Sequence, residues 1–396
     1  MFKNETVFVL GAGASWHYGY PTGEGLVHQI SRMAQRLSRH CKYILEHENP
    51  NFNIPEYVKQ KIKTENDLEQ AKTAWESVKK ECDTLVDRLR TVRPLLIDHF
   101  LAWNENLRPI GQMMIAAVIL QCEASGSVSP GNYNHLLTTK GDIRNPRIDS
   151  SEINDDWYRF IIHKLVYGCQ NPSDLLKNKV RFITFNYDTS LDYHLLRGLS
   201  SIDLLGPDIT SEFLDNDRII HVYGSIHPKI PTNSEFIDLK SMKTLGSFEL
   251  NNLAARAALK PITAALDHCL RAAKTLRTVD PHDKEVNKPS LEMAKYFIQN
   301  SSVIYILGYG FDENNNLRIG LDPYLKYSEK NHKSVLFTNF GDVNNINKRV
   351  SRLMFGAADR FLSQSIHNHI ESIDYAEKST RTVYEALEKD FESLEG

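Results

Sequence analysis

The sequence predicts an α/β fold, a Rossmann-like doubly wound parallel sheet with large helical insertions. Five short apolar runs rich in Val, Ile and Phe each end in small or polar residues that can leave a sheet. Helical stretches lie between these runs, as expected where parallel strands are joined by crossover helices. About 170 residues separate the first run from the second, far more than one crossover requires, so this interval is predicted to be a helical insertion.

The first predicted strand is Val7–Leu10, which is apolar throughout and passes directly into the glycine turn Gly11-Ala12-Gly13-Ala14-Ser15. This pattern is typical of a buried parallel strand. The other predicted strands are Val180–Thr184, Ile219–Tyr223, Val303–Leu307 and Ser334–Thr338. Ligands of such sheets bind at the carboxyl ends of the strands, so we expect a site where these runs end.

The long insertion contains a stretch with apolar residues at alternating spacings of three and four, which is a heptad pattern. Its members are Leu68, Ala71, Trp75, Val78, Cys82, Leu85, Leu89 and Val92. The pattern fits either an oligomerisation helix or, as we favour, a long helix packed within its own domain. A second helical block is predicted from about Leu250 to Leu276, and the tail after Arg360 is predicted to form one or two amphipathic helices.

These patterns predict one large domain and a C-terminal segment. The domain covers residues 1–345, with helical insertions at about 24–178 and 245–300. Residues 346–396 form the C-terminal helical segment.

Composition narrows the classes of function. The 396 residues are 41% hydrophobic, and 47 basic against 50 acidic side chains give a formal net charge of −3. This balance provides no general attraction for nucleic acid or an anionic membrane, so no direct nucleic-acid binding is predicted, although a local basic patch remains compatible with it. The longest nearly unbroken apolar run, Met113–Leu120, is too short to span a membrane, and Val7–Leu10 is too short for a signal peptide. We therefore expect a cytoplasmic protein.

The five cysteines are scattered and form no C-x-x-C pair. A disulfide framework and a four-cysteine zinc site are therefore not expected, and no metal is predicted. The glycine turn also departs from the dinucleotide fingerprint G-x-G-x-x-G, because Trp16 occupies the position of the third glycine. No phosphate-binding loop of the G-x-x-x-x-G-K-[ST] type occurs. The turn could approach a pyrophosphate, or it could serve only strand–helix packing.

Five motifs at the predicted strand ends resemble the sirtuin-like domain of bacterial NAD-consuming defence proteins. They occur in the order found in that family and span residues 5 to about 345. The motifs are Gly11–Ser15, Gly19–Gly23, Thr184–Asp188, His221–Ser225 and Leu307–Phe311.

The resemblance implies an NAD site. The glycine turn and the Pro21-Thr22 pair would face the phosphates and the nicotinamide ribose, whereas Gly308, Tyr309 and the Thr338-Asn339 pair would line the phosphate and adenosine end. The residues expected to contact NAD are Gly11, Ala12, Gly13, Ser15, Pro21, Thr22, Asp188, Tyr223, Gly224, Ser225, Gly308, Tyr309 and Asn339.

Catalysis would involve an asparagine and a histidine. Asn186 matches the catalytic asparagine of the family, and Asp188 would contact the ribose or cap the following helix. The family places a histidine where this chain has Tyr223, so His221 or His227 would supply the imidazole. We favour His227, because it lies in the loop after the predicted strand, whereas His221 could be a buried core histidine.

The implied reaction is hydrolysis of NAD to nicotinamide and ADP-ribose, without a metal. Absence of the two C-x-x-C pairs of protein-deacetylating sirtuins favours hydrolysis over deacylation. Two further segments, Ile97–Leu101 and Asp156–Tyr158, resemble family segments beside the cleft or simply pack helices. The resemblance also implies antiviral defence, a homo-oligomer and a regulatory partner, either a HerA-type ATPase or an Argonaute-like protein. The alternatives are a module that senses NAD or ADP-ribose without turnover, and an NAD-dependent protein deacylase.

Overall fold

The computed structural model divides the chain into two compact units, and each is described here by itself. The first unit comprises Met1–His17, Asn154–Val222 and Asp283–Gly396, and the second comprises Tyr18–Ile153 and Tyr223–His282. The structure describes residues 1–64, 67–125, 156–215, 217–227, 252–277, 288–321, 334–341, 343–355, 376–379 and 381–390.

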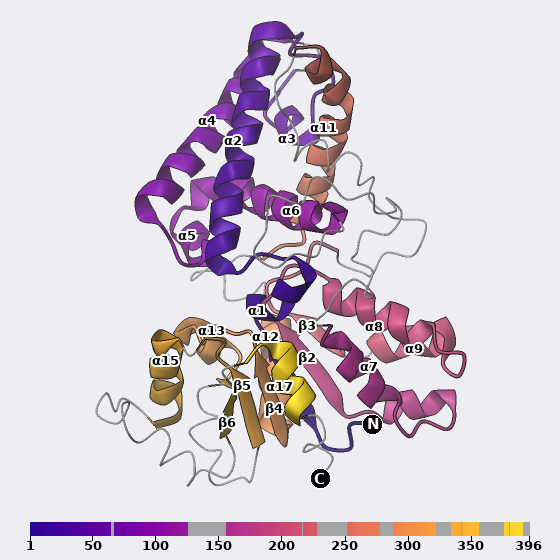
Figure 1. Ribbon diagram of the computed structural model, residues 1–396. Helices are drawn as coiled ribbons and strands as arrows, with labels where there is room; N and C mark the ends of the chain where they lie inside the picture. Colours follow the sequence, from indigo (N-terminus) through magenta and orange to yellow (C-terminus); the bar gives the residue numbers. More distant parts are fainter. Residues whose placement is uncertain are drawn as a thin grey trace. The chain divides into compact units, whose positions relative to one another are not determined.

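The first unit contains a six-stranded parallel sheet with the order β3-β2-β1-β4-β5-β6 (Figure 1). The strands are β1 (Thr6–Leu10), β2 (Val180–Thr184), β3 (Ile219–His221), β4 (Val303–Leu307), β5 (Ser334–Thr338) and β6 (Ala376–Ser379). This is the strand order of dinucleotide-binding Rossmann folds, in which the order reverses between β1 and β4. The predicted Rossmann-like α/β class is therefore confirmed.

The centre of the sheet is held by apolar side chains on β1 and its two neighbours. Every residue of β1 is buried. The ring of Phe8 stacks between Phe182 of β2 and Tyr305 of β4, with ring centroids 5.2 Å and 4.6 Å away. Such central strands expose neither face to water, which explains why the sequence reads as a continuous apolar run rather than an alternating one.

Three strands differ from the prediction. β1 begins at Thr6, one residue before the predicted Val7. β3 ends at His221 instead of Tyr223, although the backbone N–H of Val222 still donates to Thr184 O. β6 lies in the tail that was predicted to be helical. Its sequence, Ala-Glu-Lys-Ser, has neither an apolar run nor β-branched residues, so its place in the sheet comes from pairing with β5 rather than from local propensity. Residues 356–375, within the same predicted tail, lie outside the described part of the chain.

The helices of the first unit lie around the sheet (Figure 1). They are α1 (Ala12–Ser15), η1 (Trp16–Tyr18, which reaches the boundary between the units), α7 (Tyr158–Val166), η4 (Pro172–Lys177), α8 (Ser190–Ser200), α9 (Gly206–Asp215), α12 (Lys288–Asn300), α13 (Glu313–Arg318), α15 (Asn344–Phe355) and α17 (Val383–Asp390). α17 is a helix in the tail, as predicted. The elements α7, α8 and α9 gather near β2 and β3, and α13 and α15 near β5, so both halves of the sheet carry helices.

The described part of the second unit is helical. Its elements are α2 (Gly23–His47), α3 (Glu56–Lys59), α4 (Leu68–Val92), α5 (Ile97–Trp103), η2 (Glu105–Leu107), α6 (Arg108–Ser125) and α11 (Asn252–Ala273). The predicted block from about Leu250 to Leu276 corresponds to α11, and the predicted breaker Pro281-His282-Asp283 lies outside the described residues. Every residue of α6 from Met113 to Leu120 is buried. Within the described residues, no helix combines the length and apolar character needed to cross a membrane.

The heptad pattern belongs to α4, which packs along α2 (Figure 1). Trp75, Cys82 and Leu85 are fully buried within this single chain, whereas Leu68 and Val92 at the helix ends are 48% and 52% exposed. Asp67 begins the helix by accepting hydrogen bonds from the backbone N–H groups of Glu69 and Gln70. The heptad seam therefore serves packing within the unit, the interpretation that we favoured.

Candidate active site

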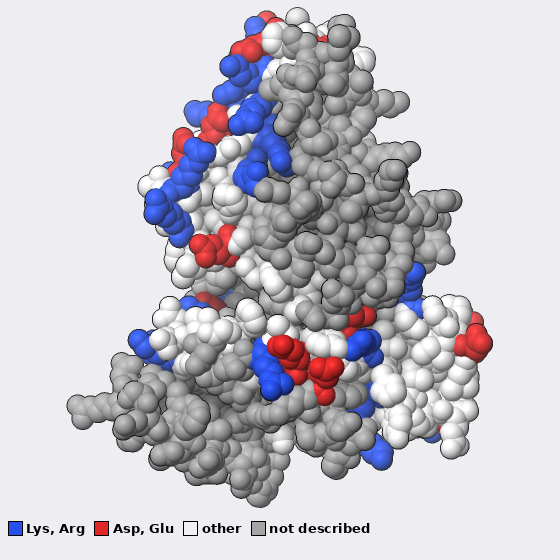
Figure 2. All heavy atoms as spheres, viewed as in Figure 1, with Lys and Arg blue, Asp and Glu red and all other residues white. Residues whose placement is uncertain are grey.

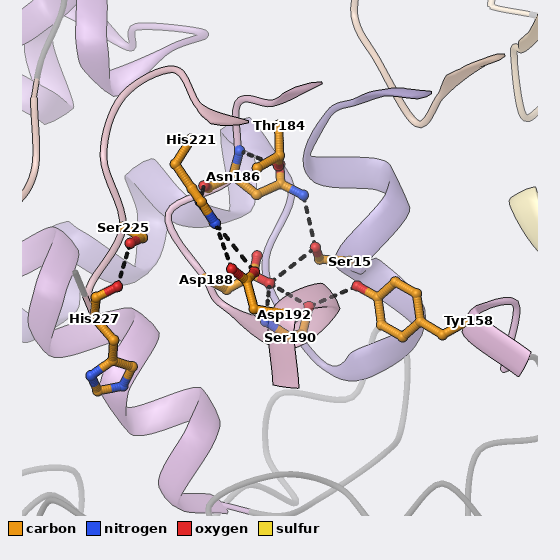
Figure 3. A network of polar contacts seen from close by, with 10 residues as sticks. All are labelled: Ser15, Tyr158, Thr184, Asn186, Asp188, Ser190, Asp192, His221, Ser225 and His227. Carbon is orange, nitrogen blue, oxygen red and sulfur yellow. Dashed lines mark hydrogen bonds and ion pairs between the residues drawn. The ribbon is translucent and has the colours of Figure 1, made fainter. Parts of the chain in front are cut away.

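A largely buried group of polar side chains lies in the first unit, where β1, β2 and β3 end (Figure 3). Ser15 follows β1, Asn186 and Asp188 follow β2, and His221 is the last residue of β3. We call this group the Asn186 cluster; it consists of Ser15, Tyr158, Thr184, Asn186, Asp188, Ser190, Asp192 and His221. Polar groups are costly to bury unless they are hydrogen-bonded, and the cluster meets this condition through bonds among its own members.

Asn186 is at the centre of the cluster and is 9% exposed. Its Nδ2 donates to Ser15 Oγ at 2.7 Å and to the carbonyl oxygen of Gly11 at 3.1 Å, and its backbone N–H donates to Thr184 Oγ1 at 3.0 Å. Both amide protons are therefore used within the chain. Within the described residues, Asn186 Oδ1 accepts no hydrogen bond, so this atom is the one that can receive a proton donor from a ligand.

From the described residues, Asp188 accepts hydrogen bonds through Oδ1 only. Its Oδ1 accepts hydrogen bonds from the Ser15 hydroxyl at 3.3 Å, from the backbone N–H of Ser190 at 3.1 Å, and from the Ser190 hydroxyl. The Ser190 hydroxyl also forms a hydrogen bond with Tyr158 OH at 2.8 Å. The contact with the first residue of α8 is a cap-like interaction, which was one of the two roles expected for Asp188. Asp188 Oδ2 has no bond to the described residues and, like Asn186 Oδ1, is open to a donor.

Burial is the main influence on the Asp188 carboxyl. It raises the pKa of Asp188, and the hydrogen bonds from Ser190 and Ser15 and the charge of His221 offset only part of that rise. A carboxyl with a raised pKa exchanges protons more readily near neutral pH than an ordinary surface aspartate does.

His221 is held between two acceptors. Its Nδ1 is 3.3 Å from the carbonyl oxygen of Asn186, and its Nε2 is 3.2 Å from both carboxylate oxygens of Asp192. A carbonyl oxygen and an ionised carboxylate only accept hydrogen bonds, so these surroundings favour the imidazolium form, in which both ring nitrogens donate. Burial lowers the pKa of His221, but Asp192 and the hydrogen bonds outweigh it and the net shift is upward. In the imidazolium form His221 has no free nitrogen with which to accept a proton.

His227 belongs to the second unit and has a different partner. Its Nε2 lies 3.0 Å from Glu123 Oε2, on a glutamate of α6 that is 2% exposed. The segment before it is tied to the end of α11, because Tyr223 O accepts the N–H of Arg277 at 2.8 Å and Ser225 O accepts Thr275 Oγ1 at 2.5 Å. Gly224 adopts φ +70° in this segment, and a Cβ there would lie 2.1 Å from Thr275 O. Pro21 and Thr22 also belong to this unit, in which Thr22 is the N-cap of α2.

The glycine turn after β1 packs tightly against the end of β4. A Cβ on Gly11 would lie 2.6 Å from Gly308 O, and one on Gly13 would lie 2.8 Å from Gly308 Cα. Gly13 N–H donates to Gly308 O at 2.9 Å, and Gly308 N–H donates to Thr338 Oγ1 at 2.8 Å. These glycines are thus needed for chain packing, the plainer of the two expected roles, and the two N–H groups are not available to a phosphate. Ala12 opens α1 in the same turn.

The residues expected at the adenosine end have structural partners. Asn339 is 1% exposed; its Nδ2 donates to Val343 O and Asn347 Oδ1, and its Oδ1 accepts the N–H of Val343. Its amide therefore fixes the loop after β5. The ring of Tyr309 stacks on Phe185 with centroids 5.1 Å apart. Phe311 adopts φ +50°, an uncommon conformation for a bulky residue, so the chain after β4 is locally strained.

Four members of the cluster were not selected as site residues from the sequence: Tyr158, Thr184, Ser190 and Asp192. Asp192 lies four residues after Asp188, one helical turn along, and that spacing was a signal available in the sequence. Tyr158 reaches Ser190 across 32 positions of the chain, and beside it Trp157 Nε1 donates to Ala14 O at 2.8 Å. The segment Asp156–Tyr158 therefore braces the cluster, whereas the α5 segment Ile97–Leu101 is packed within the second unit.

The donor and acceptor pattern can be tested against NAD. The open acceptors Asn186 Oδ1 and Asp188 Oδ2 suit hydroxyl donors such as those of a ribose. The glycine N–H groups expected to meet the phosphates are already bonded, so the cluster fits the ribose part of NAD better than the turn fits its pyrophosphate. No group of His, Cys, Asp or Glu side chains among the described residues is arranged to hold a metal ion.

Comparison with known proteins adds no relative. No protein-family model, curated protein or solved structure matches this chain. A function must therefore be argued from the geometry of the Asn186 cluster and from the sequence resemblance.

Proposed function

We propose that this chain is an NAD glycohydrolase that converts NAD and water to nicotinamide, ADP-ribose and a proton. The observation that carries the proposal is the Asn186 cluster, a buried polar network with two open acceptor oxygens at the carboxyl ends of the strands. The strand order supports it, because sheets of this order bind dinucleotides outside the carboxyl ends of their strands. The ordered motifs of the sequence add the resemblance to NAD-consuming sirtuin-like domains.

In the proposed reaction the glycosidic bond breaks with its electron pair passing to the nicotinamide nitrogen, which leaves an oxocarbenium-like ribose. Asn186 Oδ1 would accept a hydrogen bond from a ribose hydroxyl. An ionised Asp188 would stabilise the positive charge that develops on the sugar. Water then bonds to the ribose carbon, and Asp188, with its raised pKa, is suited to accept the proton. His221 would act as a positioning residue, because it holds the backbone of Asn186 through that residue's carbonyl oxygen.

The biological setting is proposed from the resemblance alone. The chain would deplete NAD as the effector of a bacterial antiviral defence system, acting in the cytoplasm as a homo-oligomer. A regulatory partner, a HerA-type ATPase or an Argonaute-like protein, would restrain the activity until infection.

One observation favours a second candidate, a module that binds NAD or ADP-ribose without turnover. Both ring nitrogens of His221 face acceptors, which favours the imidazolium form, and that form could not act as a base. Such a module would need the same open acceptors for binding but no proton transfer.

The test is release of nicotinamide and ADP-ribose from NAD by the purified chain, alone and with lysate of phage-infected cells. Asn186→Ala is expected to reduce release at least ~100-fold, the usual loss when an electrostatic contact to the reacting centre is removed. The matched control is Asn178→Ala, which removes another buried asparagine whose bonds go to Phe2, Leu165 and Leu175. It should leave turnover per folded molecule unchanged.

The other outcomes separate the candidates. NAD binding without release in any condition would favour the sensing module. Release only when an acylated peptide is present would favour the deacylase. Unchanged release in Asn186→Ala would remove the Asn186 cluster from the reaction, and His221→Ala and His227→Ala would then show whether either histidine is required.

A further inference from the structure

The middle of α2 carries a row of positive charge. Between Glu24 and Glu46 the helix has no acidic residue, whereas its basic residues Arg32, Arg36, Arg39 and Lys42 lie there. Their spacings of four, three and three place them on one face of the helix. Arg32, Arg39 and Lys42 are exposed and Arg36 is half-buried, and Figure 2 shows Lys and Arg side chains gathered over α2 and α4. We call Arg32, Arg36 and Arg39 the arginine row.

The arginine row lacks acidic partners. Among the described residues, none of its three guanidinium groups forms an ion pair, whereas Lys42 pairs with Glu46 at 3.7 Å. Partial burial and the neighbouring charges of Arg32 and Arg39 both lower the pKa of Arg36, so the three cations repel one another. An anion that met all three would relieve this repulsion.

The helix presents the row rigidly. The opposite face of α2, which includes Ile30, Leu37 and Cys41, is buried in the core of the unit. With a rise of about 1.5 Å per residue, the three arginines span roughly 10 Å along the helix axis. A row anchored on a packed helix loses little freedom on binding, unlike cations on a loop.

We propose that the arginine row binds the phosphate backbone of a nucleic acid. One strand of a duplex presents a charge about every 3.4 Å along its axis, so a row of roughly 10 Å can meet about three phosphates. Guanidinium groups suit phosphate oxygens because their planar N–H donors bind in pairs. Contacts of this kind hold the backbone and carry no base sequence, so binding is independent of sequence. This activity lies beyond NAD hydrolysis and needs none of the residues of the Asn186 cluster.

The cations of α4 provide the matched control. Lys72, Lys80 and Arg90 are also exposed, but acidic residues lie among them on the same helix. The variant R32Q/R36Q/R39Q and the control K72Q/K80Q/R90Q therefore remove the same charge from neighbouring helices. Neither set lies in the Asn186 cluster, so both variants should keep the melting temperature and any NAD turnover of the parent chain.

The experiment measures fluorescence anisotropy of labelled 20-nucleotide duplex DNA, single-stranded DNA and RNA with the full chain over a range of salt concentrations. R32Q/R36Q/R39Q is expected to weaken duplex binding at least ~10-fold and to reduce the slope of log K against log salt by about 2 to 3, and the control less than ~2-fold. The single-stranded arms show which form of the backbone the row prefers.

Three results would overturn the proposal. In the first, the parent chain would bind none of the three nucleic acids. In the second, the two variants would weaken binding equally, which would mean that only overall charge matters. In the third, poly-glutamate would compete for the chain as well as unlabelled duplex DNA does, which would mean that the arginine row recognises an acidic protein surface. None of these results depends on NAD hydrolysis, so the experiment can reject nucleic-acid binding by the arginine row without bearing on the proposed NAD hydrolysis.

Discussion

Gly308, which follows β4, lies against the glycine turn that follows β1. It adopts φ +58°, and a Cβ there would lie 2.1 Å from the backbone nitrogen of Ala14. Both the left-handed backbone conformation and the lack of space exclude a larger residue, and the two causes can be separated by comparison with Gly206. Gly206 adopts φ +71° but has nothing within 4 Å of its Cβ position.

Gly308→Ala is therefore expected to lower the free energy of unfolding by clearly more than Gly206→Ala does. Gly206→Ala is expected to cost only about 1–2 kcal/mol, because alanine disfavours the left-handed backbone conformation. Gly308→Ala adds a steric clash between the new Cβ and backbone atoms. Urea unfolding of both variants measures the difference. Equal losses would mean that the chain relaxes at Gly308 and that the close approach to the glycine turn is unimportant.

The ion pair of His221 and Asp192 predicts a pH dependence. The pKa of His221 is raised in the folded chain, so the pair's contribution is fully present below the unfolded pKa of about 6.5. It is lost as the pH rises through the higher folded pKa. Asp192→Asn should thus reduce the free energy of unfolding most near pH 5.5 to 6, and less at alkaline pH.

Thermal melts across pH 5.5 to 9 check this dependence. Asp87→Asn, at an exposed position of α4, is the control and should give a small offset at every pH. A loss for Asp192→Asn that does not shrink with rising pH would show that His221 is neutral in the folded chain.

The sequence located the polar residues of the site that lie beside strand ends, but it did not find their partners. Asn186 and Asp188 follow directly after an apolar run, so their position was predictable. Tyr158 contacts Ser190 only because α7 packs against α8, and nothing local to either residue signals this contact. The hydrogen bond from Gly13 N–H to Gly308 O was equally invisible, since it joins two segments almost 300 residues apart.

At the scale of elements, α4 shows how a heptad pattern can serve its own chain. Trp75→Ala is expected to lower the free energy of unfolding by about 3–5 kcal/mol, because a fully buried Trp is removed from the contact with α2. The matched variant Leu68→Ala alters the same seam at an exposed helix end and should cost less than about 1 kcal/mol.

Size-exclusion chromatography of both variants completes this test. The oligomeric state should be unchanged in each, since the seam is buried inside one chain. A change of state in Leu68→Ala would show that the exposed end of the seam joins two copies.

Strands and helices were predictable to different degrees. β2, β4 and β5 have the predicted bounds, because their apolar runs are bounded by polar or small residues. β6 was not predictable, since a four-residue polar strand at the sheet edge owes its conformation to β5. The extent of α4 could be predicted from its heptad pattern. The pattern could not show that α2 is the helix that packs on it, because periodicity identifies an apolar face without identifying what covers it.

For the whole molecule, the division into two units predicts two unfolding events. Each unit has its own buried core, with Phe8, Phe182 and Tyr305 in one and Trp75 and Leu85 in the other. Scanning calorimetry should resolve two transitions, since separate cores commonly unfold separately. Gly308→Ala is expected to lower the midpoint of one transition and Trp75→Ala that of the other. A single transition that both variants lower would show one cooperative body.

The central pair of strands also has a consequence for synthesis. β1 ends at Leu10, and its neighbour β2 begins only at Val180, so residues 11–179 must be synthesised between them. At translation rates of about 5–20 residues per second, roughly 10 to 30 seconds pass before the partner of β1 leaves the ribosome. During that interval the nascent chain carries an apolar strand with unpaired edges. We therefore expect Val7–Leu10 to be a segment at which the nascent chain is prone to aggregate, and slower synthesis to lengthen the exposure of its edges.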